Sequence, residues 1–148
     1  MIDLLLEAVK DIAIMIGTSA GLNFILRSKL VIPFQKKLIP YLPITVLLEE
    51  SLFRAAPFFI LGFFTNDPRI LIGVSTSLFA LVHLPNLKDI KHTTSDTIKY
   101  LINIAVLGGI LGYIYLQQGF IFTYTIHLVY DFIVTGFLLL AEKYGRKK

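Results

Sequence analysis

The chain has 148 residues, of which 55% are hydrophobic and only 16% are charged, with a formal net charge of +4. Soluble domains usually carry about 25% charged residues, so this composition indicates an integral membrane protein. The absence of cysteine excludes disulfides and thiolate catalysis, and the lack of a basic stripe interleaved with aromatic residues argues against nucleic-acid binding.

The length predicts one membrane-embedded domain, residues 1–148, with its functional motifs between about 43 and 142. The first residues, Met1-Ile2-Asp3, lack the positive stretch that begins a signal peptide, so we expect them to be mature sequence.

Apolar runs separated by charged clusters predict an all-α, polytopic transmembrane helix bundle of about five spans. The expected helices are Leu4–Leu26, Pro43–Phe64, Arg69–Leu84, Thr97–Leu116 and Phe120–Glu142. Turns are expected at Asn66-Asp67-Pro68 and Gln117-Gln118-Gly119. Pro57 should kink the second helix, because proline removes a helical hydrogen bond.

Small residues recur along two of these helices. Ala13, Gly17 and Gly21 follow one another at four-residue spacing in the first. The fourth holds a second group of small residues, namely Ala105, Gly108, Gly109 and Gly112. Such stripes let another helix approach closely in a membrane. Chance in a glycine-rich apolar run is the alternative.

The positive charges indicate an orientation. The linker Arg27–Lys37, the polar loop Lys88–Lys99 and the tail Lys143–Lys148 hold eleven of the 14 Lys and Arg residues. Cytoplasmic loops are enriched in these residues, so we expect the N-terminus outside and the C-terminus in the cytoplasm. In a straight-helix arrangement, Glu49 and His83 then lie near the cytoplasmic side and His127 lies deeper, a mismatch that the sequence leaves open.

Ionisable residues form three short patterns inside the apolar runs. They are Glu49-Glu50-x-x-x-Arg54, Phe79-x-x-x-His83 and His127-x-x-x-Asp131. Such groups cost several kcal/mol within a membrane, so they are candidates for a functional site. His92, in a polar loop, is expected to be solvent-exposed.

Helical spacing predicts which of these side chains lie on the same face of a helix. Residues four apart share a face, so Glu50 and Arg54 should form an ion pair, and His127 and Asp131 should face one cavity. Glu49 points about 100° away from Glu50, which would leave it free to face that cavity. The alternatives are that both glutamates lie at a wet interface, and that His83 caps a helix end.

Glutamate and histidine together can activate a water molecule, and a second histidine can stabilise a carbonyl oxyanion. This set suits peptide-bond hydrolysis without a covalent intermediate. Glu, His and Asp are also plausible zinc ligands. The chain lacks a His-Glu-x-x-His pattern, so zinc is not favoured and no metal or other cofactor is expected.

The three patterns, in this order and each on an expected membrane helix, resemble the CPBP (Abi) family of intramembrane proteases. That family includes the type II CAAX prenyl endopeptidases and bacteriocin self-immunity proteins. The resemblance covers about Glu49 to Asp131. It implies a helical bundle with an internal polar cavity. It further implies that Glu49 and His83 activate water and that His127 and Asp131 bind the oxyanion, with Glu50, Arg54 and Phe79 in support.

Two features depart from that family. Asp131 stands where the prenyl endopeptidases have asparagine. It must therefore be protonated, as burial favours, or orient His127, or help to bind a metal. Five helices are also fewer than in larger members, so either a homo-oligomer supplies the rest or the cavity is more open.

The preferred hypothesis is a membrane endopeptidase whose substrate is a hydrophobic or lipidated, for example prenylated, peptide in the lipid bilayer. A non-catalytic, immunity-like or peptide-binding membrane protein of the same fold is the first alternative. A transporter is the second, although no inverted repeat is evident.

Overall fold

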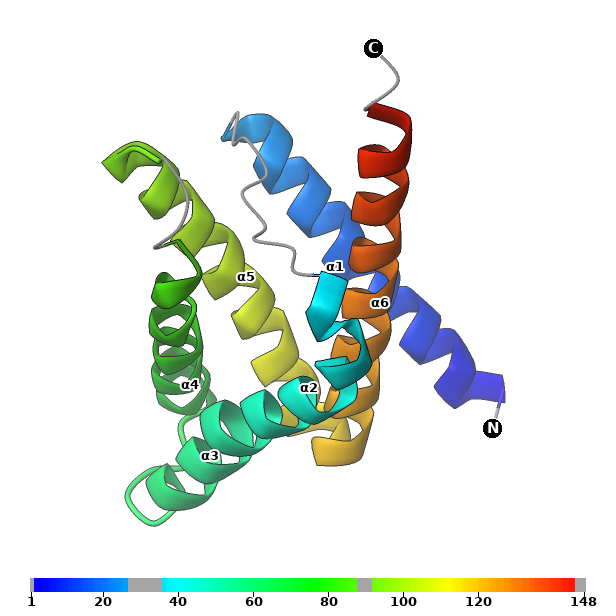
Figure 1. Ribbon diagram of the computed structural model, residues 1–148. Coiled ribbons are helices and arrows are strands. Elements are labelled where there is room, and N and C mark those ends of the chain that lie inside the picture. Colours follow the sequence, from blue (N-terminus) through cyan, green and yellow to red (C-terminus); the bar gives the residue numbers. More distant parts are fainter. Residues whose placement is uncertain (1, 27–35, 88–91, 146–148) are drawn as a thin grey trace.

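The computed structural model describes residues 2–26, 36–87 and 92–145, and all regular elements within these ranges are helices. The long helices are α1 (Ile2–Ile25), α4 (Pro68–Val82), α5 (Thr94–Gln118) and α6 (Phe120–Gly145) (Figure 1). The second expected helix is a run of three elements, α2 (Leu42–Glu50), η2 (Ser51–Ala55) and α3 (Ala56–Leu61). Short 3₁₀ turns, η1 (Lys36–Tyr41) and η3 (Leu84–Leu87), precede α2 and follow α4. The all-α prediction is confirmed, and most of the linker Arg27–Lys37 lies outside the described residues.

The helix ends follow local capping chemistry. Asp67 caps α4 by accepting a hydrogen bond from the Arg69 backbone N–H at 2.8 Å, and Pro68 occupies the first turn. Gly119, with φ +81°, separates α5 from α6 in a conformation that favours glycine. Thr93 and Asp96 form a capping box. This box starts α5 three residues before the predicted Thr97, because it supplies partners for exposed backbone N–H groups.

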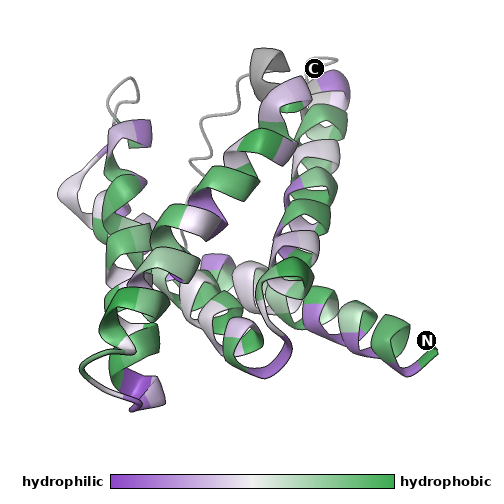
Figure 2. Ribbon diagram, turned by 90° about the horizontal axis from the view of Figure 1, so that it is seen from below, coloured by the Kyte–Doolittle hydropathy of each residue, from purple (hydrophilic) through white to green (hydrophobic). Residues whose placement is uncertain are grey.

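Three of the described helices are long and apolar enough to cross a membrane: Pro68–Leu87, Thr94–Gln118 and Phe120–Ala141. Large apolar side chains also cover the outer surface, including Phe59, Phe63 and Phe64, which are 71%, 72% and 82% exposed. Figure 2 shows apolar residues along the length of the helices. Lipid is the solvent that suits such a surface. That α1 and the α2–α3 run also span, giving five spans in all, stays a prediction.

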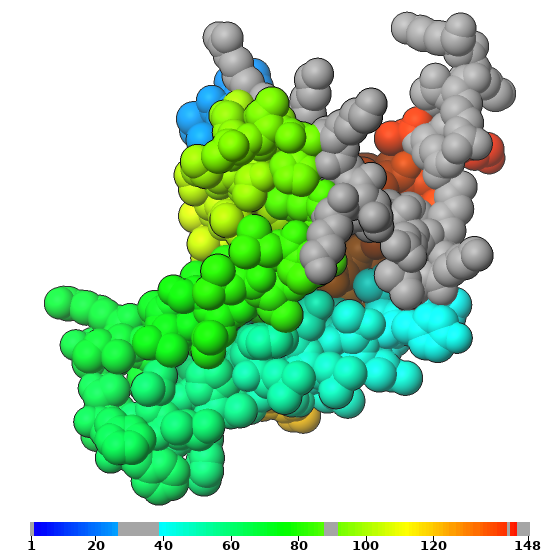
Figure 3. Space-filling model, turned by 60° about the vertical axis from the view of Figure 1, so that its left-hand side comes forward, coloured from blue at the N-terminus to red at the C-terminus, as the bar shows by residue number. Residues whose placement is uncertain are grey.

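The α2–α3 run does not lie parallel to the other helices. In Figure 1 it leaves the side of α6 and slants across the bundle towards the start of α4. Figure 3 shows the same run passing below α4 and α5 on that face. Near its middle the helix widens to a π-helical turn, in which the Ala56 N–H bonds to the Ser51 carbonyl, just before Pro57. The kink predicted at Pro57 stays a prediction, and the structure shows the widened turn directly before it.

The core lies where α1, α5 and α6 meet. Its buried members come from all three helices: Met15, Leu107, Leu111, Ile114, Ile126 and Tyr130. Polar pairs accompany this packing. Gln118 donates to the buried Asp11 at 3.2 Å, and Asn103 donates to Asn23 at 3.2 Å, so α5 is bonded to α1 at two levels. Such pairs satisfy polar groups that lipid cannot.

The two glycine stripes behave differently. A Cβ placed on Gly108 would lie 3.1 Å from Phe79 Cδ1, and one on Gly112 would lie 3.3 Å from Ile72 Cγ2. The predicted close-packing face on α5 is therefore present and receives α4. A Cβ on Gly17 or Gly21 would meet no atom of the described chain within 4 Å. The predicted close approach at the first stripe is thus wrong within the described chain, because α5 and α6 pack on another face of α1.

We expect Gly108→Ala to destabilise the protein by about 1 kcal/mol. The added methyl group overpacks against Phe79, which costs about 1–3 kcal/mol, while alanine returns about 0.5–1 kcal/mol in helix propensity. The matched control is Gly17→Ala, which should be neutral or slightly stabilising. Unfolding of both variants in mixed micelles measures the difference. Equal stability of the two would show that the Phe79 ring has room to move.

Candidate active site

The candidate site is centred on His127 of α6, whose ring is approached by carboxylates from two directions. Nδ1 lies 2.8 Å from Oε1 of Glu50, a direct hydrogen bond. On the other side, Nε2 lies 3.9 Å from Oε2 of Glu49 and 3.8 Å from Oδ2 of Asp131. These two distances are too long for hydrogen bonds. One imidazole therefore meets three carboxylates, two from α2 and one from its own helix.

Burial is graded across this group. The side chains of Glu50 and Arg54 are 0% exposed and that of His127 is 6% exposed. The side chains of Glu49 and Asp131 are 22% and 29% exposed. The Nδ1 side of the ring thus faces the closed interior, and the Nε2 side faces the part of the site that is open to other molecules.

The predicted ion pair between Glu50 and Arg54 is present, with Nε 3.3 Å from Oε2. The structure adds a contact that the sequence analysis missed, because Glu50 also binds His127. The expected separation, with Glu50 purely structural and Glu49 alone at the site, is therefore too simple. The wet-interface alternative is wrong for Glu50, whose side chain is fully buried.

Phe79 and His83 on α4 close another side of the site. The Phe79 ring lies 4.5 Å from the His83 ring and 5.8 Å from the His127 ring, centroid to centroid. The guanidinium of Arg54 lies 4.8 Å from the Phe79 centroid, in a cation–π contact. Phe79 therefore contacts both histidines, and its role as a wall of the site stays a prediction.

His83 ends α4, and its Nδ1 lies 2.7 Å from the Phe79 carbonyl oxygen. Because a carbonyl only accepts, Nδ1 carries the proton and donates. The helix-capping alternative thus describes one nitrogen of this ring. In the neutral ring that leaves Nε2 as an acceptor, so a second role at that nitrogen is compatible with the cap.

Ser75 is a buried polar residue that the sequence analysis did not identify. Its side chain is 0% exposed, and its Oγ accepts a hydrogen bond from Arg54 Nη1 at 3.1 Å. A signal was available, since Ser75, Phe79 and His83 follow one another at four-residue spacing and so share a face of α4. His92 is exposed, as predicted.

The expected difference in depth between Glu49 and His127 does not exist, because the two side chains are neighbours. The expectation of different depths depended on the assumption that all helices run straight across the membrane. The α2–α3 run slants across the bundle, so position along the sequence does not convert to depth in the way that upright helices would require (Figure 1).

Among the described residues, no group of three or more His, Asp or Glu side chains is arranged to hold a metal ion. That the site works without zinc stays a prediction, and no chemical step is assigned to a metal.

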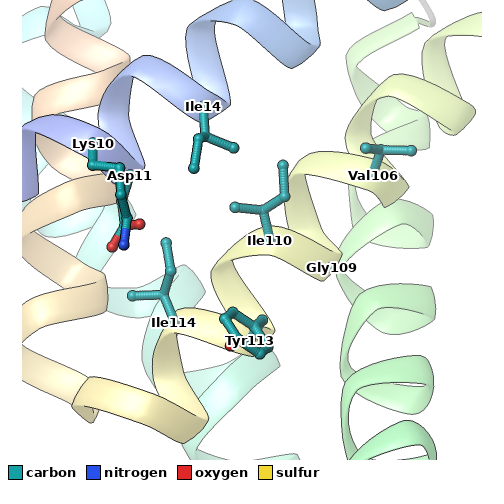
Figure 4. Close-up of a pocket in the computed structure, with 8 residues that line it drawn as sticks. All are labelled: Lys10, Asp11, Ile14, Val106, Gly109, Ile110, Tyr113 and Ile114. Atoms are coloured by element: carbon teal, nitrogen blue, oxygen red, sulfur yellow. The ribbon is translucent and has the colours of Figure 1, made fainter. Parts of the chain in front are cut away.

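A separate hollow lies between α1 and α5. It has a volume of about 470 Å³ and an open, mostly apolar lining, with Lys10 and Asp11 on one side and Tyr113 on another (Figure 4). Its lining includes none of the candidate catalytic residues. The internal polar cavity expected around those residues stays a prediction.

Comparison with protein families gives a match to this chain. The model of the type II CAAX prenyl endopeptidase Rce1-like family matches residues 35–133, which is more than half of the chain and includes all three patterns. No curated protein and no solved structure matched the chain in two further comparisons. Together with the three membrane-length apolar helices, the match shows that this chain is an integral membrane protein of the type II CAAX prenyl endopeptidase Rce1-like family.

Proposed function

We propose that the protein is an intramembrane endopeptidase that hydrolyses peptide bonds of membrane-associated, prenylated or otherwise lipidated peptides. One observation carries the proposal. Side chains from α2 and α6 converge on His127, and Phe79 links His83 of α4 to the same ring. All of them lie within the stretch that matches the family.

In the proposed reaction, Glu49 is the general base. Its carboxylate is the one on α2 that is partly exposed. It accepts a proton as the oxygen of a water molecule attacks the peptide carbonyl carbon. It then returns that proton to the leaving nitrogen as the carbon–nitrogen bond breaks. His83 assists through Nε2, since Nδ1 is occupied by the Phe79 carbonyl.

His127 is proposed to stabilise the oxyanion through Nε2. Glu50 fixes Nδ1 as a donor, so only the doubly protonated ring can also donate from Nε2. The carboxylates of Glu50 and Glu49 provide the opposite charge that such an imidazolium needs. Asp131, beside Nε2, is proposed to donate to the oxyanion in its protonated form, as the amide of asparagine would in the prenyl endopeptidases.

The proposed orientation puts the N-terminus outside and the C-terminus in the cytoplasm. The distribution of Lys and Arg supports it. The cleaved peptide would therefore reach the site from the cytoplasmic leaflet, with its lipid chain in the bilayer beside the apolar outer faces of the helices. A homo-oligomer is compatible with this arrangement.

The test is hydrolysis of a fluorogenic farnesylated peptide by the purified protein in liposomes. Wild-type protein should cleave the peptide, and His83→Ala should lower the rate by about 10²-fold, in the range of one catalytic acid–base group. His92→Ala is the matched control, because this histidine is exposed outside the site, and it should cleave at the wild-type rate. Binding of the peptide by wild-type protein without cleavage would instead indicate the non-catalytic alternative.

Asp131→Asn should keep the rate within about threefold of wild type, because an amide N–H replaces the donor that a protonated carboxyl group provides. Asp131→Ala should lose about 10²-fold, as expected for removal of one oxyanion donor. Rates of the two variants in the same assay measure the difference. If the asparagine variant is as slow as the alanine variant, the negative charge of Asp131 is what the reaction needs.

A further inference from the structure

Ser75 connects α4 to the α2–α3 run through two hydrogen bonds of fixed direction. Its Oγ lies 2.5 Å from the Phe53 carbonyl oxygen and 3.1 Å from Arg54 Nη1. The carbonyl can only accept and the guanidinium can only donate, so the Ser75 hydroxyl donates to Phe53 and accepts from Arg54. The whole side chain is buried, so water does not replace either bond readily.

The Phe53 carbonyl is available for this bond because of Pro57. A proline has no N–H, so the carbonyl four residues earlier lacks its α-helical donor. The helix widens at this point, with the five-residue bond from Ala56 to Ser51. A side chain from a neighbouring helix commonly satisfies a backbone group that proline leaves free in a membrane protein. Ser75 is that side chain here.

The bond between Ser75 and Arg54 connects Ser75, through Glu50, to His127. Arg54 Nε lies 3.3 Å from Glu50 Oε2, and Glu50 Oε1 lies 2.8 Å from His127 Nδ1. All three side chains are almost fully buried. Arg54 Nη2 and Nε have no hydrogen-bond partner among the described residues, although Nε lies in the ion pair with Glu50. Ser75 therefore supplies the hydrogen bond that fixes the guanidinium.

We propose that Ser75 is a positioning residue for His127, acting through Arg54 and Glu50. This inference rests on the proposed function only in its rate prediction. Loss of the Ser75 hydroxyl leaves Arg54 Nη1 and the Phe53 carbonyl without partners. Arg54 is then free to rotate about its contact with Phe79, and Glu50 no longer presents Oε1 to Nδ1 in one fixed geometry. Small displacements of this kind reduce the rate of turnover more than they weaken substrate binding.

The first measurement is steady-state kinetics of Ser75→Ala with the farnesylated peptide. We expect kcat to fall about tenfold with KM within twofold of wild type. The matched control is Ser77→Ala. Ser77 lies on the same helix, is exposed, and bonds only to the Gly73 carbonyl of its own helix among the contacts described. It should behave as wild type. Ser75→Cys, which keeps the volume but is a weak donor and acceptor, replaces Ser75→Ala if that variant does not fold.

The second measurement is independent of activity. In protein labelled with ¹⁵N-histidine, the His127 ring-nitrogen resonances, assigned with His127→Gln, should shift in Ser75→Ala and stay unchanged in Ser77→Ala. A shift in protein that cleaves no peptide would support the positioning role and remove the proposed function. Wild-type resonances and wild-type kcat in Ser75→Ala or Ser75→Cys would overturn the inference.

Discussion

Replacing Arg54 by methionine is expected to lower the free energy of unfolding by about 3 kcal/mol. Arg54 is fully buried, and it is the cation that faces the equally buried Glu50. Removing one partner of a buried ion pair leaves an unpaired charge, which costs about 3–5 kcal/mol in soluble proteins, and a lone carboxylate at membrane depth costs about 3 kcal/mol. Methionine keeps much of the volume, so loss of packing contributes little.

Unfolding of the purified variant in mixed micelles measures this change. Arg69→Met is the matched control, because Arg69 is exposed at the start of α4 and its replacement should change the stability by less than about 0.5 kcal/mol. The double variant Glu50→Gln/Arg54→Met should recover part of the loss, since it removes the charge left unpaired. Wild-type stability of Arg54→Met would show that the pair is not buried in the folded protein.

The sequence predicted the helices and their order well. Apolar runs are long, and signals such as Asp67-Pro68 before α4 and Gly119 after α5 act locally. The Glu50–Arg54 pair was predictable for the same reason, since four-residue spacing on one helix fixes which side chains meet. The predicted start of α5 at Thr97 is three residues late, because the Thr93–Asp96 capping box begins the helix inside the stretch predicted as a polar loop.

Contacts between helices were not predictable to the same degree. The bond between Glu50 and His127 joins residues 77 positions apart, and periodicity within one helix contains no distance to another. The slant of the α2–α3 run is not predictable from one helix either. It brings Glu49 beside His127, so the two side chains do not differ in depth as upright helices would require. The role proposed for Ser75 depends on Pro57. The missing N–H of this proline predicts a kink from the sequence, but it does not identify which neighbouring helix bonds to the Phe53 carbonyl that it leaves free.

The glycine stripes show this limit within one sequence. Both have the spacing that permits close packing, yet only the stripe on α5 receives another described helix, at Gly108 and Gly112. The pattern states which face can be approached. Which face is approached depends on the packing of every other helix. In this chain the core between α1, α5 and α6 leaves the Gly17 side of α1 uncovered by other described residues.

Glu49→Gln is expected to reduce turnover by about 10²–10⁴-fold while leaving stability within about 0.5 kcal/mol of wild type. The side chain is 22% exposed and lies 3.9 Å from His127, so no direct hydrogen bond to that ring is lost. Glutamine keeps the shape but is a much weaker base, so water is no longer activated. The comparison is Glu50→Gln, the same substitution one residue later. That side chain is fully buried, forms an ion pair with Arg54 and is hydrogen-bonded to His127.

Glu50→Gln should cost about 2 kcal/mol of stability, because it weakens two charge-assisted contacts in the interior. Turnover of the farnesylated peptide and unfolding in mixed micelles, measured on both variants, separate a catalytic carboxylate from a structural one. Peptide binding should persist in Glu49→Gln, since the side chain acts on water and not on the substrate. If Glu49→Gln turns over at more than a tenth of the wild-type rate, another group is the base, and the assignment of Glu49 must be abandoned even if the protein proves to be a protease.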